Sequence, residues 1–224
     1  MQAGIGSLVK RHIPLTEVMR EPLPKGFVYL TDLIPYALLE IRYYTSYNCV
    51  GAPIDGYLRP LAIITEPAAV QLEKAAREMY KKGLIIKVFD AYRPLAAVNH
   101  FVRWAADEND ILTKEFFYPE ICKSRIIPDG FIAERSSHSR GSTVDLTLTD
   151  MKTGRDLDMG TAFDFFGEAS MHGSPLITQE QAGRRLILRE AMENVGFTPY
   201  ETEWWHYTLS GEPYPDTYFE FMVN

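Results

Sequence analysis

The stretch 136–148, Ser-Ser-His-Ser-Arg-Gly-Ser-Thr-Val-Asp-Leu-Thr-Leu, constrains the fold more than any other part of the chain. From Thr143 onward apolar and polar residues alternate, which predicts a strand with one apolar face. Asp145 projects from the polar face of that strand. Gly141 lets the preceding chain bend, so that His138 can return over the same spot. We therefore expect an imidazole and a carboxylate to meet at the start of this strand.

A metal site needs a further ligand, and the segment Glu-Trp-Trp-His near the C-terminus offers one in His206. Together with His138 and Asp145 it forms a nitrogen and oxygen set of the kind that zinc hydrolases use, with one position left for water. Zinc lowers the pKa of such a water to about 7, and Glu203 would act as the general base. Strict strand alternation would put Glu203 and His206 on opposite faces. The metal hypothesis therefore requires a bulge or turn between Glu203 and Trp205.

Each of these residues also has a simpler interpretation. A single histidine is more often a packed or surface residue than a ligand, and at least one of Trp204 and Trp205 is expected in the core. Arg93 follows a predicted strand in Asp-Ala-Tyr-Arg-Pro. Its guanidinium could clamp a carboxylate or stabilise an oxyanion, or it could form only a salt bridge with Asp90. A Ser–His–Asp hydrolase is a rival hypothesis, but the sequence contains no G-x-S-x-G elbow.

The composition is typical of one soluble domain. The chain has 224 residues, of which 46% are hydrophobic, enough to bury a sizeable core. A net charge of −7 argues against a nucleic-acid partner. No apolar run reaches the roughly 20 residues of a membrane helix. Its two cysteines, Cys49 and Cys122, favour free thiols over a disulfide framework, and a single bridge stays open.

The sequence periodicity predicts helices and strands without a regular βαβ rhythm. Helices are expected at 66–82, 95–107 and 178–195, and strands at 38–45, 84–89, 143–148, 197–200 and 205–209. Thr65 is expected to cap the first helix, and Thr178 with Gln181 to form a capping box on the third. The glycine-containing segment 152–174 is expected to be irregular, as functional or mobile segments often are. We predict a single α+β domain with a mainly antiparallel sheet flanked by helices.

Residues 1–26 are interrupted by prolines and show no periodicity, so we expect an N-terminal arm, with the folded domain at 27–224. Lys10 and Arg11 are not followed by the apolar core of a signal peptide. This favours the cytoplasm, or the periplasm if a targeting segment has been removed. The sequence does not determine the oligomeric state, and a homodimer is one of the open alternatives.

Five motifs are separated along the chain from about Tyr29 to the C-terminus. They are Ser-Ser-His-Ser-Arg-Gly-Ser-x-x-Asp-Leu-Thr-Leu at 136–148, Glu-Trp-Trp-His-Tyr at 203–207, Asp-x-Tyr-Arg-Pro at 90–94, Met-Gly-x-x-Phe-Asp at 159–164 and Glu-Pro-Tyr-Pro at 212–215. Together they resemble the D-alanyl-D-alanine dipeptidase family of zinc metallopeptidases, the type known from glycopeptide-resistance clusters. The resemblance implies a fold like that of hedgehog signalling domains and a catalytic domain over 27–224.

The resemblance also implies roles for individual residues. His138, Asp145 and His206 match the family's zinc ligands, with one ion per chain. Glu203 matches its general base. Arg93 matches the arginine that binds and stabilises the reacting oxygen.

The substrate implied is D-alanyl-D-alanine, a small dipeptide cleaved to two D-alanines. Asp164 and Tyr43, with Ser136 nearby, match the groups that receive its free amine. A site that grips the charged end of a short zwitterion can exclude longer chains. Thr143 departs from the motif, where the wider family usually has alanine, but no ligand is lost.

Two other functions remain open at this stage. One is a D,D-carboxypeptidase that trims peptidoglycan stem peptides, which would need an open groove where the amine is held. The other is a non-catalytic binding module with a structural zinc. The presence of Glu203 beside a predicted ligand argues against it. The setting, whether antibiotic resistance, nutrient recycling or cell-wall turnover, does not follow from the sequence.

Overall fold

The computed structural model describes residues 20–224, so residues 1–19 of the expected arm lie outside the described part. The strands are β1 (Phe27–Tyr29), β2 (Leu38–Leu39), β3 (Ile63–Thr65), β4 (Leu84–Asp90), β5 (Thr143–Asp150), β6 (Phe197–Tyr200) and β7 (Glu203–Leu209). The helices are α1 (Leu30–Leu33), α2 (Glu66–Lys81), α3 (Leu95–Ala106), α4 (Lys114–Phe117) and α5 (Gln179–Glu193).

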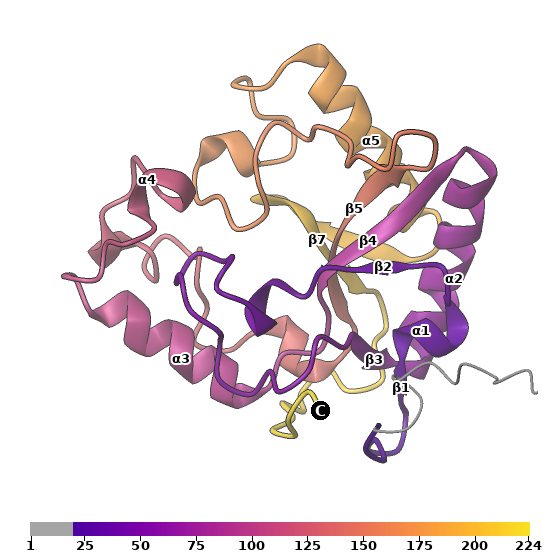
Figure 1. Cartoon of the computed structure of the whole chain (residues 1–224), viewed down its shortest axis with the longest axis horizontal. Helices are drawn as coiled ribbons and strands as arrows, with labels where there is room; N and C mark the ends of the chain where they lie inside the picture. Colours follow the sequence, from indigo (N-terminus) through magenta and orange to yellow (C-terminus); the bar gives the residue numbers. More distant parts are fainter. Residues whose placement is uncertain (1–19) are drawn as a thin grey trace, which may run out of the picture.

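A mixed sheet of order β2-β4-β5-β7-β6 forms the centre of the molecule, and β1 pairs with β3 beside it. Within the larger sheet only β2 and β4 run parallel, and the other neighbours are antiparallel. Helix α2 contacts β4, α5 contacts β6, and the two helices contact each other. Figure 1 shows α3 and α4 on the opposite side of the molecule from α2. The predicted single α+β domain with a mainly antiparallel sheet is confirmed.

Strand β5 lies in the middle of this sheet, and the alternation predicted for it is present. Val144, Leu146 and Leu148 are fully buried, as expected for the apolar face. The other face is buried too, since Asp145 and Thr147 expose only 1% and 2% of their surfaces. Polar groups in such a position need partners within the protein or a ligand. The candidate functional site lies on this covered polar face.

The strand expected at 38–45 is largely wrong. β2 ends at Leu39, and Arg42–Tyr44 form a 3₁₀ turn. The turn directs the Tyr43 ring against Phe101, with ring centroids 4.9 Å apart, and buries it. Tertiary packing has overridden the β propensity of the β-branched and aromatic residues in this stretch.

The helix starts illustrate the same point. Thr65 precedes α2 but does not cap it with its side chain, because its Oγ1 is paired with Ser142 Oγ at 2.7 Å. The capping box predicted for α5 is present, with Thr178 and Gln181 each bonded to the other's backbone. Local signals therefore held where the helix start is exposed and failed where it is buried.

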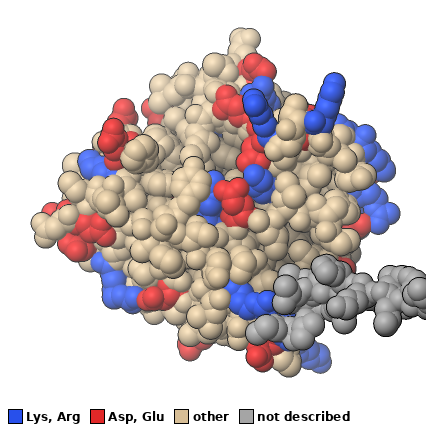
Figure 2. Space-filling view, in the orientation of Figure 1, with Lys and Arg blue, Asp and Glu red and all other residues tan. Residues whose placement is uncertain are grey.

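No helix within residues 20–224 is long and apolar enough to cross a membrane. Both cysteines are free thiols, Cys49 buried and Cys122 exposed. On the face drawn in Figure 2, lysine and arginine side chains are interspersed with acidic ones.

The turn before β5 depends on Gly141. Ser137–Arg140 form a 3₁₀ turn whose first backbone groups are held by Ser136, since its Oγ accepts from the His138 N–H at 3.3 Å. Gly141 ends the turn in the left-handed conformation, with φ of +85°. A Cβ at this position would overlap the ring of the buried Phe27. The glycine is thus required both for its conformation and for the close approach of Phe27.

We predict that Gly141→Ala lowers the free energy of unfolding by more than about 2 kcal/mol, because left-handed strain adds to overpacking. Urea denaturation measures this loss. The matched control is Gly154→Ala, at φ of +68° with nothing within 4 Å of the added Cβ, for which about 1 kcal/mol is expected. Equal losses in the two variants would contradict the overlap with Phe27.

Candidate active site

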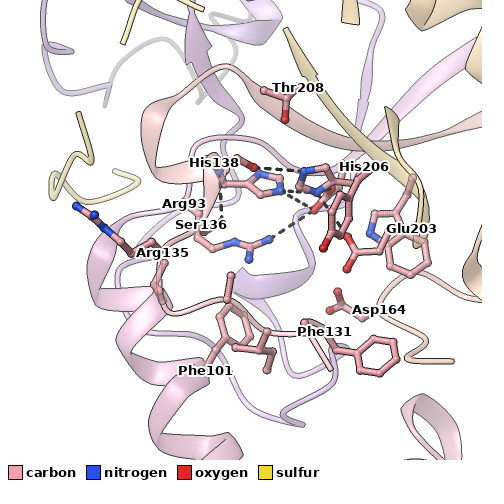
Figure 3. A pocket seen from close by; sticks show the side chains of 18 of the residues that line it. Arg93, Phe101, Phe131, Arg135, Ser136, His138, Asp164, Glu203, His206 and Thr208 are labelled. Atoms are coloured by element: carbon pink, nitrogen blue, oxygen red, sulfur yellow. Dashed lines mark hydrogen bonds and ion pairs between the residues drawn. The ribbon is translucent and has the colours of Figure 1, made fainter. Parts of the chain in front are cut away.

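His138, Asp145 and His206 meet in one cavity, as Figure 3 shows for the two histidines. Asp145 on β5 lies directly opposite His206 on β7 in the strand pairing, and the turn before β5 returns His138 to them. His138 Nε2 and His206 Nδ1 each lie 3.2 Å from an oxygen of the Asp145 carboxylate. The two ring nitrogens are 3.3 Å apart.

The hydrogen bonds around this cluster leave electron pairs facing its centre. His138 Nδ1 donates to the Ala91 carbonyl at 2.7 Å, which makes Nε2 the acceptor. His206 Nε2 can donate to Ser137 Oγ at 3.3 Å, which leaves Nδ1 free. Asp145 Oδ1 is buried without a hydrogen bond. Buried acceptors that face one another are satisfied by a shared proton or by a metal ion, and two imidazoles with a carboxylate suit zinc. The residues therefore fit a metal ion.

Glu203 reaches the cluster because β7 is irregular. Pro199 of β6 pairs with Tyr207, and the next residue, Tyr200, pairs with Glu203, so the intervening residues of β7 bulge out. The bulge that the sequence predicts in this segment is present. It brings Glu203 Oε2 to 3.5 Å from His206 Nδ1, although strict alternation would separate the two side chains. Both tryptophans of the bulge are buried.

Arg93 forms the salt bridge with Asp90 that the sequence allowed, and its other N–H groups point into the cavity. Its Nε donates to Asp90 Oδ2 at 2.9 Å, and Asp90 Oδ1 accepts from the Tyr57 hydroxyl at 2.6 Å. Its Nη2 lies 3.5 Å from Asp145 Oδ2 and donates to the Tyr43 hydroxyl at 3.4 Å. The salt bridge to Asp90 therefore aims the remaining N–H groups at the cavity, as Figure 3 shows.

A second polar group lies in the same cavity, around Asp164. Its Oδ1 accepts from the Tyr43 hydroxyl at 2.9 Å, whereas Oδ2 is buried without a partner. Asp164 has φ of +63°, and no other non-glycine residue between 20 and 224 has a positive φ. Ser136 also lines the cavity, next to the cluster.

The cavity has a volume of about 450 Å³ and an opening to solvent. Apolar side chains form much of its wall around the polar groups. They include Val98, Phe101, Phe131, Ile132, Phe166 and Trp205. Such walls exclude water and strengthen the interactions of the few charges inside.

Comparison with known proteins identifies the family. The model of peptidase family M15, described as D-ala-D-ala dipeptidase, matches residues 24–224. The chain belongs to this family. It is 43% identical to a D-alanyl-D-alanine dipeptidase of Enterococcus faecalis, over 90% of this chain and 100% of the relative. A D-alanyl-D-alanine dipeptidase of Streptomyces coelicolor is 38% identical, over 88% of this chain and 98% of the relative.

Family M15 peptidases are metal-dependent, and this chain is accordingly a metallopeptidase with a possible metal site at His138, Asp145 and His206. Burial lowers the pKa of the His138 imidazole, which favours the neutral form that a ligand needs. Burial acts against ionisation of Asp145, but the two histidines outweigh it and hold the pKa of its carboxyl below the usual range.

Two other carboxyl groups of this M15 site have raised pKa values. Burial raises the pKa of Glu203 to about 7, and the charges of Asp145 and Asp164 add to the effect. Burial also raises the pKa of Asp164 to about 7, against the opposing charge of Arg93. Both groups can therefore exchange protons near neutral pH.

The structure brings together all the residues that the sequence singled out for this site. Sequence reasoning missed two contributors: Tyr57 holds Asp90 from a loop with no periodic signal, and Ser137 touches His206. Cys49, expected at the pocket edge near Tyr43, lines the cavity. Only Ser137 lay within a motif, and nothing in the spacing assigned it to His206.

We predict that Asp164→Asn changes how the stability of the metal-free protein depends on pH. The native state holds the Asp164 proton up to about pH 7, whereas the unfolded state releases it near pH 4. The native state thus binds more protons between these values, and the free energy of unfolding falls as the pH rises. Relative to the variant, the wild type should lose up to about 4 kcal/mol from pH 4 to 7. Denaturation at several pH values gives the free energy of unfolding of both proteins. If this free energy changes with pH in the same way for both, Asp164 is not held protonated.

Proposed function

We propose that this chain, with residues 27–224 as its catalytic domain, is a zinc-dependent dipeptidase that hydrolyses D-alanyl-D-alanine to two D-alanines. The relatives from Enterococcus faecalis and Streptomyces coelicolor carry the name of this activity. The observation that supports it most strongly is the unpaired Asp164 oxygen, buried in the same cavity as the His138–Asp145–His206 cluster. A carboxylate there offers a counter-charge to a free amine close to the reacting bond.

His138, Asp145 and His206 would hold the ion, through His138 Nε2, a carboxylate oxygen and His206 Nδ1. When bound, zinc supplies a Lewis acid that acidifies water and polarises a peptide carbonyl. The Ala91 carbonyl and Ser137 hydroxyl fix the orientation of the two rings.

Glu203 is the proposed general base. Its carboxylate accepts a proton from the attacking water and returns it to the amine of the departing D-alanine. A pKa near 7 suits both halves of this cycle, because a much stronger acid would not accept the proton. Its position 3.5 Å from His206 Nδ1 supports this role, because it keeps the carboxylate beside the proposed metal ligands.

Arg93 is proposed to donate hydrogen bonds to the carbonyl oxygen as negative charge develops on it. Asp90 fixes the guanidinium in advance, so little reorganisation is needed during the reaction.

The amine end of the dipeptide is proposed to bind Asp164 and Tyr43, with Ser136 beside them. Asp164 Oδ2 would accept from the ammonium group, and Tyr43 keeps the carboxylate in place through Oδ1. Blocking the amine removes its charge and leaves Asp164 without a partner, which explains selection for a free dipeptide.

The experiment that tests this function compares D-alanyl-D-alanine with its N-acetyl derivative, by D-alanine release. We expect the zinc-loaded protein to prefer the free dipeptide by at least about 100-fold in kcat/KM, the size expected for loss of a buried charged partner. A chelator should abolish turnover, and added zinc should restore it. A preference for the blocked peptide would instead indicate a carboxypeptidase, and bound zinc without hydrolysis would indicate a binding module.

We predict that Glu203→Gln retains stoichiometric zinc and loses at least about 100-fold in kcat, because the amide cannot accept the proton. Metal analysis and steady-state kinetics on the same sample measure both quantities. Glu201→Gln is the matched control, an exposed carboxylate nearby that pairs with Arg189, and its kcat should stay unchanged. Normal turnover of Glu203→Gln would exclude Glu203 as the base.

A further inference from the structure

We propose that Arg185, on α5, is a positioning residue for substrate recognition. It fixes the loop that carries Asp164, so that this carboxylate can receive the amine of the dipeptide. The inference rests on the proposed function, and it concerns a residue outside the cavity wall.

Arg185 is buried, with 3% of its surface exposed, and its guanidinium is directed at backbone carbonyls. Nε donates to the Met159 carbonyl at 2.6 Å, on the N-terminal side of Asp164. Nη2 and Nη1 donate to the carbonyls of Ala169 and Met171 at 2.8 and 2.9 Å, on the C-terminal side. One side chain therefore ties the two ends of the Asp164 loop to each other and to α5.

The loop needs such a restraint because Asp164 is held in an unfavourable state. Its backbone is left-handed, and its Oδ2 is buried without a hydrogen bond. A residue in this conformation persists only when its surroundings fix it from several sides. Phe163 packs edge-on against Trp205, and Trp204 Nε1 donates to Thr161 Oγ1 at 2.9 Å, which restrains the middle and start of the loop. Arg185 closes it.

Arg185 acts on Asp164 through the backbone rather than by charge. Its guanidinium donates to carbonyls on both sides of Asp164, and neither carboxylate oxygen of Asp164 accepts from it. The planar guanidinium can serve several carbonyls at fixed angles, whereas a lysine ammonium cannot reproduce that geometry. Arg185→Lys therefore keeps the charge and removes the clamp.

The test measures two constants on zinc-loaded Arg185→Lys. One is KM for D-alanyl-D-alanine. The other is the inhibition constant of propionyl-D-alanine, which has the same shape but lacks the amine. We expect KM to rise at least tenfold while the inhibition constant stays within twofold, because only the amine contact is lost. Constants that rise together, or do not change, would overturn the proposal.

Arg189→Met is the matched control, since Arg189 lies one turn further along α5 and forms its ion pairs with Glu193 and Glu201 at the protein surface. It should change neither constant. If the wild type does not cleave D-alanyl-D-alanine, the proposed function fails by itself. With an active wild type, the variant alone decides on Arg185.

A double-mutant cycle with Asp164→Asn gives a second readout, with Arg185→Gln in place of Arg185→Lys should the latter not fold. If Arg185 acts through Asp164, its substitution changes KM by less than twofold once Asp164 is already Asn. A full tenfold effect in that background would show that Arg185 acts elsewhere.

Discussion

Two imidazole nitrogens and a carboxylate oxygen face one another in the middle of the sheet, and this arrangement is unfavourable unless a proton or a metal ion joins them. Much of the local architecture serves to create it. Gly141 turns the chain so that His138 comes back over Asp145, and strand pairing sets His206 opposite Asp145. The bulge in β7 then adds Glu203 to the same side. Neither hydrophobic burial nor secondary-structure propensity requires the turn at Gly141 or the bulge in β7. Both features are explained by the cluster that they bring together.

The same cavity contains a second unfavourable feature, the buried and unpaired Asp164 oxygen. Arg93 lies between the two centres, bonded to Asp90 and Tyr43 and close to Asp145. A short zwitterion could satisfy both centres at once, its amine at Asp164 and its peptide carbonyl at Arg93. The proposed selectivity for a free dipeptide would then follow from the penalty that any other ligand leaves in the cavity.

Patterns that depend on local geometry could be predicted from the sequence. The alternation from Thr143 onward gave β5, and the same alternation, applied to Glu203 and His206, required the bulge that the structure has. Features that depend on distant partners could not. The strand expected at 38–45 is mostly a turn because Tyr43 packs on Phe101, and Thr65 pairs with Ser142 rather than capping α2. Tyr57 and Arg185 likewise contact segments far from them along the chain, and no local pattern in the sequence predicts those contacts.

The most direct test of this account is diffraction from crystals of the zinc-loaded protein at the zinc absorption edge. The account predicts one anomalous peak per chain, in contact with His138 Nε2, a carboxylate oxygen of Asp145 and His206 Nδ1, with Glu203 beside it. A peak at other residues, or none in this cavity, would contradict it.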